Sequence, residues 1–320
     1  MRWQPGTTMP ILRQRAAALG EVRQFFASRA VLEVDTPALV RHAVTDVHIH
    51  SAEVRLRGHA APLYLHTSPE YAMKRLLAAG SGDIYQIAHV FRAEERSRLH
   101  NAEFTLIEWY RCGFPMLQLM QEVADLTHRL LDRPAGAPYE SVTYAQAFAR
   151  ALAIDPLQAT DSTLREVAIR RGLDARLAPR CTRDELLDWL MGTAVGPVLG
   201  GDQLCFVHRY PASQAALARL DSQDPRVALR FELYYRGIEL ANGFEELADA
   251  NEQRHRFEQD LAERSRRHLP GLSIDESLLA ALAHGLPPVS GVALGFDRVL
   301  MLRCGLRTIS EVLPFDLDRA

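Results

Sequence analysis

The sequence contains no apolar run long enough to span a bilayer, and its first residues, Met1 to Gly6, lack the apolar core of a signal peptide. Cysteine is scarce, and no pair has Cys-x-x-Cys spacing, which argues against a zinc ribbon or a disulfide framework. The four cysteines are Cys112, Cys181, Cys205 and Cys304. These absences predict a protein of the reducing cytoplasm that has no membrane association.

Lysine is almost missing as well. Lys74 is the only lysine, and every other basic residue is arginine, so we expect strong phosphate contacts to be made by arginine. The net charge is −3, and no basic tail or stripe is present, so the chain lacks the electrostatic footprint of a protein that grips nucleic acid by its backbone. With 320 residues, 48% of them hydrophobic, the chain can bury a large core in one or two domains.

The stretch from Tyr85 to Tyr110 predicts a long hairpin. Tyr85 to Ala88 leads into a first strand, and Phe104 to Tyr110 alternates apolar with polar residues as a second strand does. The residues between are charged or polar and are expected to form an exposed loop. Arg92, at the end of the first strand, can fork onto paired phosphate oxygens. A solvated, charge-paired hairpin tip is the alternative interpretation.

Helix and strand signals flank this hairpin. Apolar residues at helical spacing predict a helix over 10–30 with Arg15 on its wet face, followed by a strand over 31–39 that Pro37 ends. Ser68 is the expected N-cap of the next helix, in which Glu70 occupies the first turn.

Further along, the patterns become mainly helical and then return to strands. Residues 116–131 are predicted to be a helix, 139 to about 196 mostly helical, and 204–214 a strand and turn.

A second hairpin is predicted over 231–247, with Arg236-Gly237 as its turn. In this register Tyr234 opposes Glu239 and Glu232 opposes Ala241, so Glu232 and Glu239 share one face. Two carboxylates brought together require a cation or a retained proton. Arginines are one candidate cation, and magnesium, which prefers hard oxygen ligands, is the other.

Three strings in order resemble the motifs of the class II aminoacyl-tRNA synthetases. The first hairpin, Phe-Arg-x-Glu-Glu…His-Asn-x-Glu-Phe-Thr-x-x-Glu-Trp-Tyr, is similar to motif 2; the helix and strand ending in Thr-Pro resemble motif 1; and Gly-x-Asp-Arg, ending at Arg298, resembles motif 3. The resemblance implies an α+β fold with a mixed, mainly antiparallel sheet flanked by helices. It also implies one catalytic domain over 1–320, with motif 1 at about 10–39, motif 2 at about 85–111, a helical insertion at about 139–200 and motif 3 at about 288–303.

Within the class, Ser68-Pro69-Glu70, Glu108-Trp109-Tyr110 and Asn242-Gly243-Phe244 resemble the lysyl type, whose substrate carries a terminal amine. Only about thirty residues precede the strand at Leu32, which leaves no room in this sequence for the N-terminal oligonucleotide-binding barrel that reads an anticodon. Ala293 stands where lysyl enzymes have glycine, and its methyl narrows the pocket. A shortened lysyl-like chain with this alanine is similar to the elongation factor P–(R)-β-lysine ligase family.

That resemblance implies adenylation of (R)-β-lysine with ATP and magnesium, and transfer to a lysine of elongation factor P, by a cytoplasmic homodimer that does not use tRNA. Arg92 and Arg298 are the expected catalytic residues, and Glu232 and Glu239 the expected metal ligands. The residues implied for ATP are Arg92, Glu94, His100, Asn101, Phe104, Glu239, Leu240, Gly295 and Arg298. Those implied for the amino acid are Ser68, Pro69, Glu70, Glu108, Tyr110, Asn242, Glu246 and Ala293. The alternatives are a truncated lysyl-tRNA synthetase-like enzyme for L-α-lysine and a non-catalytic paralogue.

Overall fold

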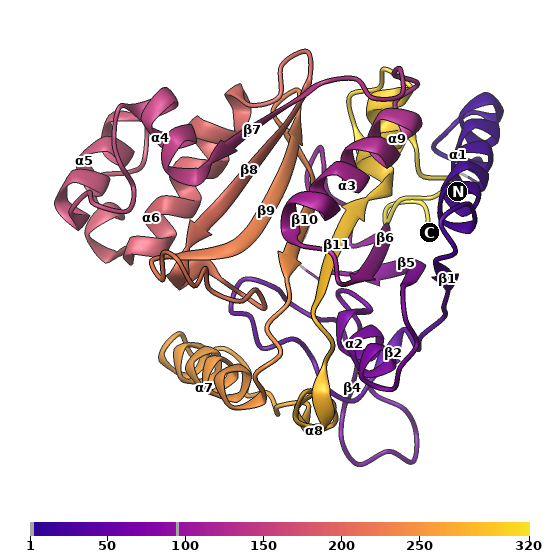
Figure 1. The fold of residues 1–320 in the computed structure, drawn as a ribbon, viewed down its shortest axis with the longest axis horizontal. Coiled ribbons are helices and arrows are strands. Elements are labelled where there is room, and N and C mark those ends of the chain that lie inside the picture. Colours follow the sequence, from indigo (N-terminus) through magenta and orange to yellow (C-terminus); the bar gives the residue numbers. More distant parts are fainter. Residues whose placement is uncertain (1–2, 94–95) are drawn as a thin grey trace. The chain divides into compact units, whose positions relative to one another are not determined.

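The computed structural model describes residues 3–93 and 96–320. The chain divides into two compact units (Figure 1): unit 1 comprises residues 1–115, 125–135 and 247–320, and unit 2 comprises residues 116–124 and 136–246. None of the helices in the part that the structure describes is long and apolar enough to cross a membrane.

Unit 1 is built on a run of four neighbouring strands in the order β1-β5-β6-β11. The β1–β5 pair is parallel, whereas β5–β6 and β6–β11 are antiparallel. Their bounds are β1 Leu32–Glu33, β5 Ile84–Phe91, β6 Glu103–Cys112 and β11 Val289–Gly295. The predicted first hairpin is therefore confirmed, with Val90 opposite Phe104.

The predicted strand over 31–39 is wrong in its extent. The chain forms two short strands there, β1 and, after Thr36-Pro37, β2 at Leu39–Val40. Proline cannot donate a ladder hydrogen bond, so the chain leaves the first sheet before it joins a second one. That second sheet has the order β2-β4-β3, with β3 at Glu53–Val54 and β4 at Leu63–Leu65.

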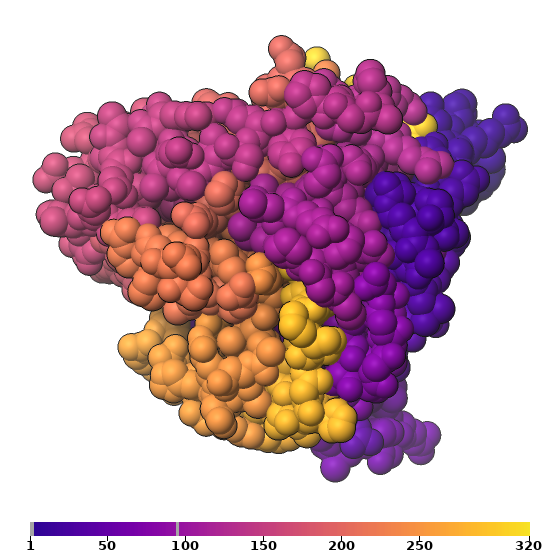
Figure 2. All heavy atoms as spheres, viewed as in Figure 1, coloured from indigo at the N-terminus to yellow at the C-terminus, as the bar shows by residue number. Residues whose placement is uncertain are grey.

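Helices cover the strands of unit 1. Phe26 of the first helix stacks on Tyr85 at 4.3 Å and meets Trp109 edge-on at 5.3 Å between ring centres, so this helix is held against β5 and β6 by buried aromatic rings. Figure 2 shows α7 and α8, orange and yellow, side by side on one face. The helices are α1 Met9–Ala27, α2 Glu70–Ala78, α7 Ala250–Arg266, α8 Glu276–Gly285 and α9 Phe296–Arg303; α3 Met116–Leu130 contributes residues to both units.

Unit 2 also contains four neighbouring strands, in the order β10-β9-β8-β7. They are β7 Tyr139–Thr143, β8 Leu204–Pro211, β9 Val227–Tyr235 and β10 Ile238–Glu245. β7 pairs with β8 in parallel and was missed by the sequence analysis, which expected mainly helix after residue 139. Both units combine mainly antiparallel strands with flanking helices, which confirms the predicted α+β fold class.

The turn between β9 and β10 lies at Arg236-Gly237 as predicted, with φ values of 51° and 71°. Glycine suits this turn because its φ is positive and because a Cβ at Gly237 would lie 2.6 Å from the carbonyl oxygen of Pro197. Glu239 opposes Tyr234 as expected, but Glu232 opposes Asn242 instead of Ala241, because the ladder shifts between Glu239 and Ala241.

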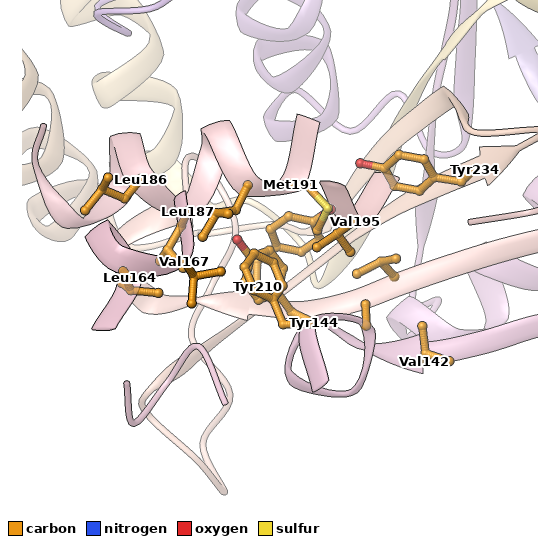
Figure 3. Close-up of a cluster of buried hydrophobic side chains, with 14 of the residues drawn as sticks. Val142, Tyr144, Leu164, Val167, Leu186, Leu187, Met191, Val195, Tyr210 and Tyr234 are labelled. Carbon is orange, nitrogen blue, oxygen red and sulfur yellow. The ribbon is translucent and has the colours of Figure 1, made fainter. Parts of the chain in front are cut away.

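The insertion supplies unit 2 with its own core. Its helices lie beside β7 and β8 (Figure 1) and bury side chains such as Phe148, Leu187 and Tyr210. Figure 3 shows Tyr144, Tyr210 and the aliphatic side chains of the helices gathered into this cluster. The helices are α4 Tyr144–Leu152, α5 Asp161–Arg170 and α6 Arg183–Leu190. Capping boxes at Thr143 and Thr182 begin α4 and α6.

Candidate active site

One face of the unit 1 sheet carries several of the predicted binding residues. Successive residues of a strand alternate between faces, so Phe104, Leu106, Glu108 and Tyr110 of β6 share one face. On β11 the residues opposite the last three are Gly295, Ala293 and Gly291. Gly291 and Gly295 contribute no side chains to this face, and Ala293 contributes only a methyl group.

Arg92 and Phe104 lie together at the start of the motif 2 loop. The guanidinium carbon of Arg92 lies 5.2 Å from the centre of the Phe104 ring, a cation–π contact. The backbone N–H of Arg92 donates to the carbonyl oxygen of Ala102 at 2.8 Å, which closes the base of the loop. A cationic group and an aromatic face are thus presented at one place. Glu94, the next predicted residue of this loop, lies outside the described residues.

Arg298 and His100 are also in contact, although 198 positions separate them in the sequence. The Arg298 Nη2 donates to His100 Nε2 at 2.6 Å, and its Nε donates to the Leu99 carbonyl at 3.3 Å. Arginine can only donate, so His100 Nε2 is the acceptor and its Nδ1 carries the proton, which is donated to Ser97 Oγ at 2.6 Å. Arg298 of α9 therefore holds the motif 2 loop, and both belong to unit 1.

Asn101 is a support of the same loop. Its side-chain Nδ2 donates to the Glu103 carbonyl at 2.7 Å, and its Oδ1 accepts the backbone N–H of Leu317 at 3.3 Å. The C-terminal segment is thereby tied to the motif 2 loop. Both ends of the amide are used within the chain, and contact of Asn101 with ATP stays a prediction.

A second group of predicted residues surrounds Glu108. One carboxylate oxygen of Glu108 accepts the hydroxyl of Ser68 at 2.6 Å, and the other accepts the hydroxyl of Tyr110 at 2.7 Å. Ser68 also accepts the backbone N–H of Glu70 at 3.0 Å. The helix begins at Glu70 with the buried Pro69 as its N-cap, so the predicted cap Ser68 lies one residue before the observed cap position. The Glu70 carboxylate pairs with Lys74 at 2.8 Å.

Burial, and after it the negative charge of Glu70, raise the pKa of Glu108 from its ordinary 4.5 to about 7. The hydroxyls of Ser68 and Tyr110 and the ammonium of Lys74 oppose this rise. A carboxyl that is 2% exposed and near another carboxylate therefore keeps its proton near neutral pH unless a further cation arrives.

Replacing Glu108 by glutamine is expected to flatten the pH dependence of stability between about 4.5 and about 7. In this window the folded protein keeps a proton that the unfolded chain releases. The unfolding free energy of the wild type therefore falls as pH rises, by at most about 1.4 kcal/mol per pH unit from this group. Urea unfolding at pH 5, 6 and 7 measures the slope. Glu53→Gln, at an exposed site, should keep the wild-type slope, and an unchanged slope in Glu108→Gln would contradict the assignment.

A buried junction that the sequence analysis missed connects all three motifs. Arg15 pairs with Asp297 and donates to Thr105 Oγ1 at 2.7 Å, while the backbone N–H of Thr105 donates to Asp297 at 2.7 Å. The expectation that Arg15 lies on the wet face of its helix is wrong, because its side chain is only 12% exposed. Asp297 belongs to the Gly-x-Asp-Arg string. Its place in that string, directly before Arg298, was the sequence signal that could have identified it as a member of this junction.

The remaining predicted residues belong to unit 2. The Glu232 carboxylate pairs with Arg230 at 2.5 Å and accepts the Tyr234 hydroxyl at 2.6 Å. Burial opposes the charged guanidinium, but the charge and hydrogen bond of Glu232, together with Tyr210 and Glu239, outweigh it, and the pKa of Arg230 is raised. Arg230 also donates to the Asn242 side chain at 3.2 Å. Arginine, one of the two cations considered from the sequence, is thus present at Glu232.

Glu239 faces the same side as Glu232, since it opposes Tyr234 across the ladder. Leu240 lies at the register shift and is buried, and Glu246 is buried beside a bridge to Ala218. Within unit 2, the geometry brings Glu232, Asn242 and Arg230 together on the β9–β10 hairpin, with Glu239 on the same face as Glu232.

The family model for class II tRNA synthetases (D, K and N) matches residues 4–319. The chain therefore belongs to this family of class II synthetases, and its α+β fold is the class II catalytic fold.

Curated relatives are more specific. The chain is 50% identical over 322 residues to a protein of Salmonella dublin named elongation factor P–(R)-β-lysine ligase, covering 99% of this chain and 98% of the relative. Relatives from Salmonella paratyphi B and Salmonella heidelberg carry the same name, with the same identity and coverage.

Proposed function

We propose that this chain is an ATP-dependent ligase that adenylates (R)-β-lysine and transfers it to a lysine side chain of elongation factor P. The observation that carries this proposal is the 50% identity, over nearly the whole of both chains, with relatives that have this name. The buried Ser68–Glu108–Tyr110 cluster supports an amine-bearing substrate, because a buried ammonium requires a carboxylate partner.

The reaction has two steps. An oxygen of the substrate carboxylate attacks the α-phosphorus of ATP, the bond to the oxygen that bridges to the β-phosphate breaks, and pyrophosphate leaves. The uncharged amine of the acceptor lysine then attacks the acyl carbon, the bond to the AMP oxygen breaks, and the amine gives up a proton. The first nucleophile is already ionised, so catalysis is positioning and charge stabilisation.

Arginines supply that stabilisation. Arg92 is proposed to bind the α-phosphate and the substrate carboxylate, and Arg298 the γ-phosphate, with adenine between Phe104 and Arg298. Glu94, His100 and Asn101 are proposed to hold the base and phosphates, and Leu240, Gly295 and Glu239 are proposed to contribute to ATP binding as well. The contact of Arg92 with Phe104 and that of Arg298 with His100 support this assignment, because each pair already presents a cation next to a planar group.

The two amines of the substrate are proposed to bind different carboxylates. Ser68, Pro69 and Glu70 would hold the near amine, and Tyr110, Asn242 and Glu246 the far one, with Glu108 beside both Ser68 and Tyr110. The burial of Glu246 supports its proposed contact with the far amine, since a buried carboxylate gains most from a cationic ligand.

Glu232 and Glu239 are proposed to hold magnesium, which would neutralise charge on the ATP phosphates. Residues 3–93 and 96–320 contain no group of three or more metal-binding side chains, which fits an ion held by one or two carboxylates and by phosphate oxygens. Arg230 pairs with Glu232 and is also acted on by the charge of Glu239, so a magnesium ion would share these carboxylates with the guanidinium.

Glu239→Gln is therefore expected to raise the magnesium concentration that gives half-maximal activity by about tenfold, the loss expected for one ligand interaction of about 1.4 kcal/mol. Pyrophosphate exchange measured against magnesium concentration checks this. The control is Glu140→Gln, an exposed carboxylate of unit 2 that pairs with Arg150. Equal magnesium requirements in both variants would remove Glu239 from the metal site.

ATP–pyrophosphate exchange with purified protein tests the proposed function. We expect exchange with (R)-β-lysine well above that with L-α-lysine, followed by labelling of elongation factor P. A preference for L-α-lysine together with charging of tRNA would favour a truncated lysyl-tRNA synthetase-like enzyme. No exchange with either amino acid would favour a non-catalytic paralogue.

Ala293→Gly is expected to weaken the preference for the β isomer. Ala293 opposes Glu108 across β11 and β6, so its methyl lies on the face that carries the amine-binding cluster. Removal of one methyl is expected to change the preference by about 1–3 kcal/mol, or about 10–200-fold. The ratio of kcat/KM for the two lysine isomers measures the effect, and an unchanged ratio would remove Ala293 from the specificity pocket.

The proposal extends to assembly and location. The helix–strand segment α1–β1, which resembles motif 1, supports a homodimer, and the net charge of −3 supports a reaction without tRNA. The scarcity of cysteine supports a cytoplasmic location. Light scattering of the purified protein tests the dimer, and a tRNA charging assay tests the exclusion of tRNA.

A further inference from the structure

Lys74 has an unusual place in this chain. The sequence has 37 basic residues, of which only Lys74 is a lysine, and this lysine is 1% exposed. Its side chain leaves α2 beside the amine-binding cluster of unit 1. Burying an ammonium is costly unless it is paired, so the fold keeps Lys74 there by giving it a partner.

That partner is Glu70, one turn earlier on the same helix. The Lys74 Nζ lies 2.8 Å from Glu70 Oε1, with the glutamate on the N-terminal side, which is the favourable order for a pair four residues apart. Lys74 also acts electrostatically on Glu108, whose oxygens accept the Ser68 and Tyr110 hydroxyls. One cation of the protein therefore serves two carboxylates.

The summed charge of Glu70, Glu108 and Lys74 decides how many further cations these side chains accept. Ionised Glu70 and Glu108 together carry −2, and Lys74 brings the sum to −1. One ammonium of a substrate then neutralises the group. Lys74 favours the ionised form of Glu108, whose pKa is about 7 with Lys74 in place. Without Lys74 the two carboxylates would hold a shared proton well above neutral pH, because two like charges at this separation do not both stay ionised in a buried site. A substrate ammonium would have to displace that proton.

A lysine fits this place better than an arginine would. An ammonium is a compact point charge, whereas a guanidinium presents five donors in a planar fork, each of which needs an acceptor when buried. A chain that otherwise contains only arginine therefore has lysine where a small cation must fit within one helical turn.

We propose that Lys74 is a positioning and specificity-determining residue of the amine site, which orients the Glu70 carboxylate and limits the Glu70–Glu108 pair to a single substrate ammonium. The inference rests on the proposed function, since it concerns the amine of the same substrate. Lys74 acts through Glu70 and does not itself touch the reacting atoms.

The charged groups near the pair come from several elements. Glu70, Tyr71 and Lys74 come from α2, and Glu108 and Tyr110 come from β6. Asp46, Asp260 and Asp275 act electrostatically on Tyr71, and Arg264 and His48 act on Asp260. The charges that act on Glu108 are those of Glu70 and Lys74, so removal of the Lys74 ammonium has one electrostatic direction: Glu108 holds its proton to higher pH.

Lys74→Met keeps the length of the side chain and removes its charge, and Lys74→Arg keeps the charge. Pyrophosphate exchange is measured against amino-acid and ATP concentration from pH 6 to pH 9. In Lys74→Met we expect the KM for (R)-β-lysine to rise about tenfold while the KM for ATP stays within about twofold. The acid limb of kcat/KM should move up by about one to three pH units. In Lys74→Arg the limb should stay near its wild-type position.

A second measurement needs no substrate. The urea unfolding free energy of Lys74→Met should continue to fall above pH 7, where that of the wild type levels off, because Glu108 keeps its proton to higher pH in the folded variant. An unmoved acid limb and an unchanged stability profile would overturn the inference, as would equal rises in both KM values. If the wild type exchanges with no diamino acid, the proposed function fails, and the stability profile alone decides the role of Lys74 as counter-ion.

Discussion

Arg92→Ala is expected to lower adenylation by about 10³-fold or more while the fold is retained. Arg92 is the cation at the base of the motif 2 loop, and its guanidinium lies over Phe104. Losing one preorganised donor to developing charge typically costs about 10²–10³-fold in rate. Arg92 is proposed to contact both the α-phosphate and the attacking carboxylate, so the loss should reach the upper end of that range or exceed it. Pyrophosphate exchange measures the rate, and thermal unfolding checks the fold.

Two variants calibrate this result. Arg92→Lys keeps the charge but lacks the planar fork, so it should recover only part of the activity. Arg96→Ala removes an arginine of the same loop whose pairing with Asp318 is exposed to solvent, so exchange should stay close to wild type. If Arg92→Ala were as active as Arg96→Ala, the assignment of Arg92 to the α-phosphate would be wrong.

Asp297→Asn should produce the largest loss of stability. The carboxylate is 1% exposed, pairs with Arg15 and accepts the backbone N–H of Thr105, so its neutralisation leaves a largely buried guanidinium without its counter-charge. Breaking one side of a buried ion pair typically costs about 3–5 kcal/mol. The KM for ATP should rise as well, because Asp297 ties the start of α9, which carries Arg298, to Thr105 of β6. Urea unfolding and exchange kinetics measure the two effects.

The matched control is Glu53→Gln, which breaks an ion pair with Arg55 in the same unit. Those side chains are 45% and 78% exposed, so the change in unfolding free energy should stay within about 1 kcal/mol. A similarly small change in Asp297→Asn would show that the three motifs are held together by other contacts.

Local sequence patterns were sufficient to predict the strands and the turn on which the site is built. The alternation of Phe104 to Tyr110 predicted β6, and Arg236-Gly237 predicted the turn of the β9–β10 hairpin, because both signals depend on residues adjacent in sequence. The order of the three motif strings was likewise sufficient for the class II family, which the family match over residues 4–319 confirms.

The features that the sequence analysis predicted wrongly or overlooked share a different physical cause: they depend on contacts between segments that are distant in the sequence. The bulge that moves Glu232 from Ala241 to Asn242 depends on how two strands twist against each other, and the break after β1 depends on which sheet accepts the next strand. The strand β7 was overlooked because its short alternating run precedes a strong helical signal, and only its parallel partner β8 stabilises it as a strand.

The sequence by itself determined the family, the main strands and helices, and the kinds of side chain available for phosphate and amine. Only the tertiary structure decided which of these side chains meet. It brought Arg15 to Asp297 across 282 positions, engaged both ends of Asn101 within the chain and placed the sole lysine against Glu70 in a buried site. The reason is that spacing along a helix or strand follows from local geometry, whereas burial and charge pairing depend on chain segments that become neighbours only after folding.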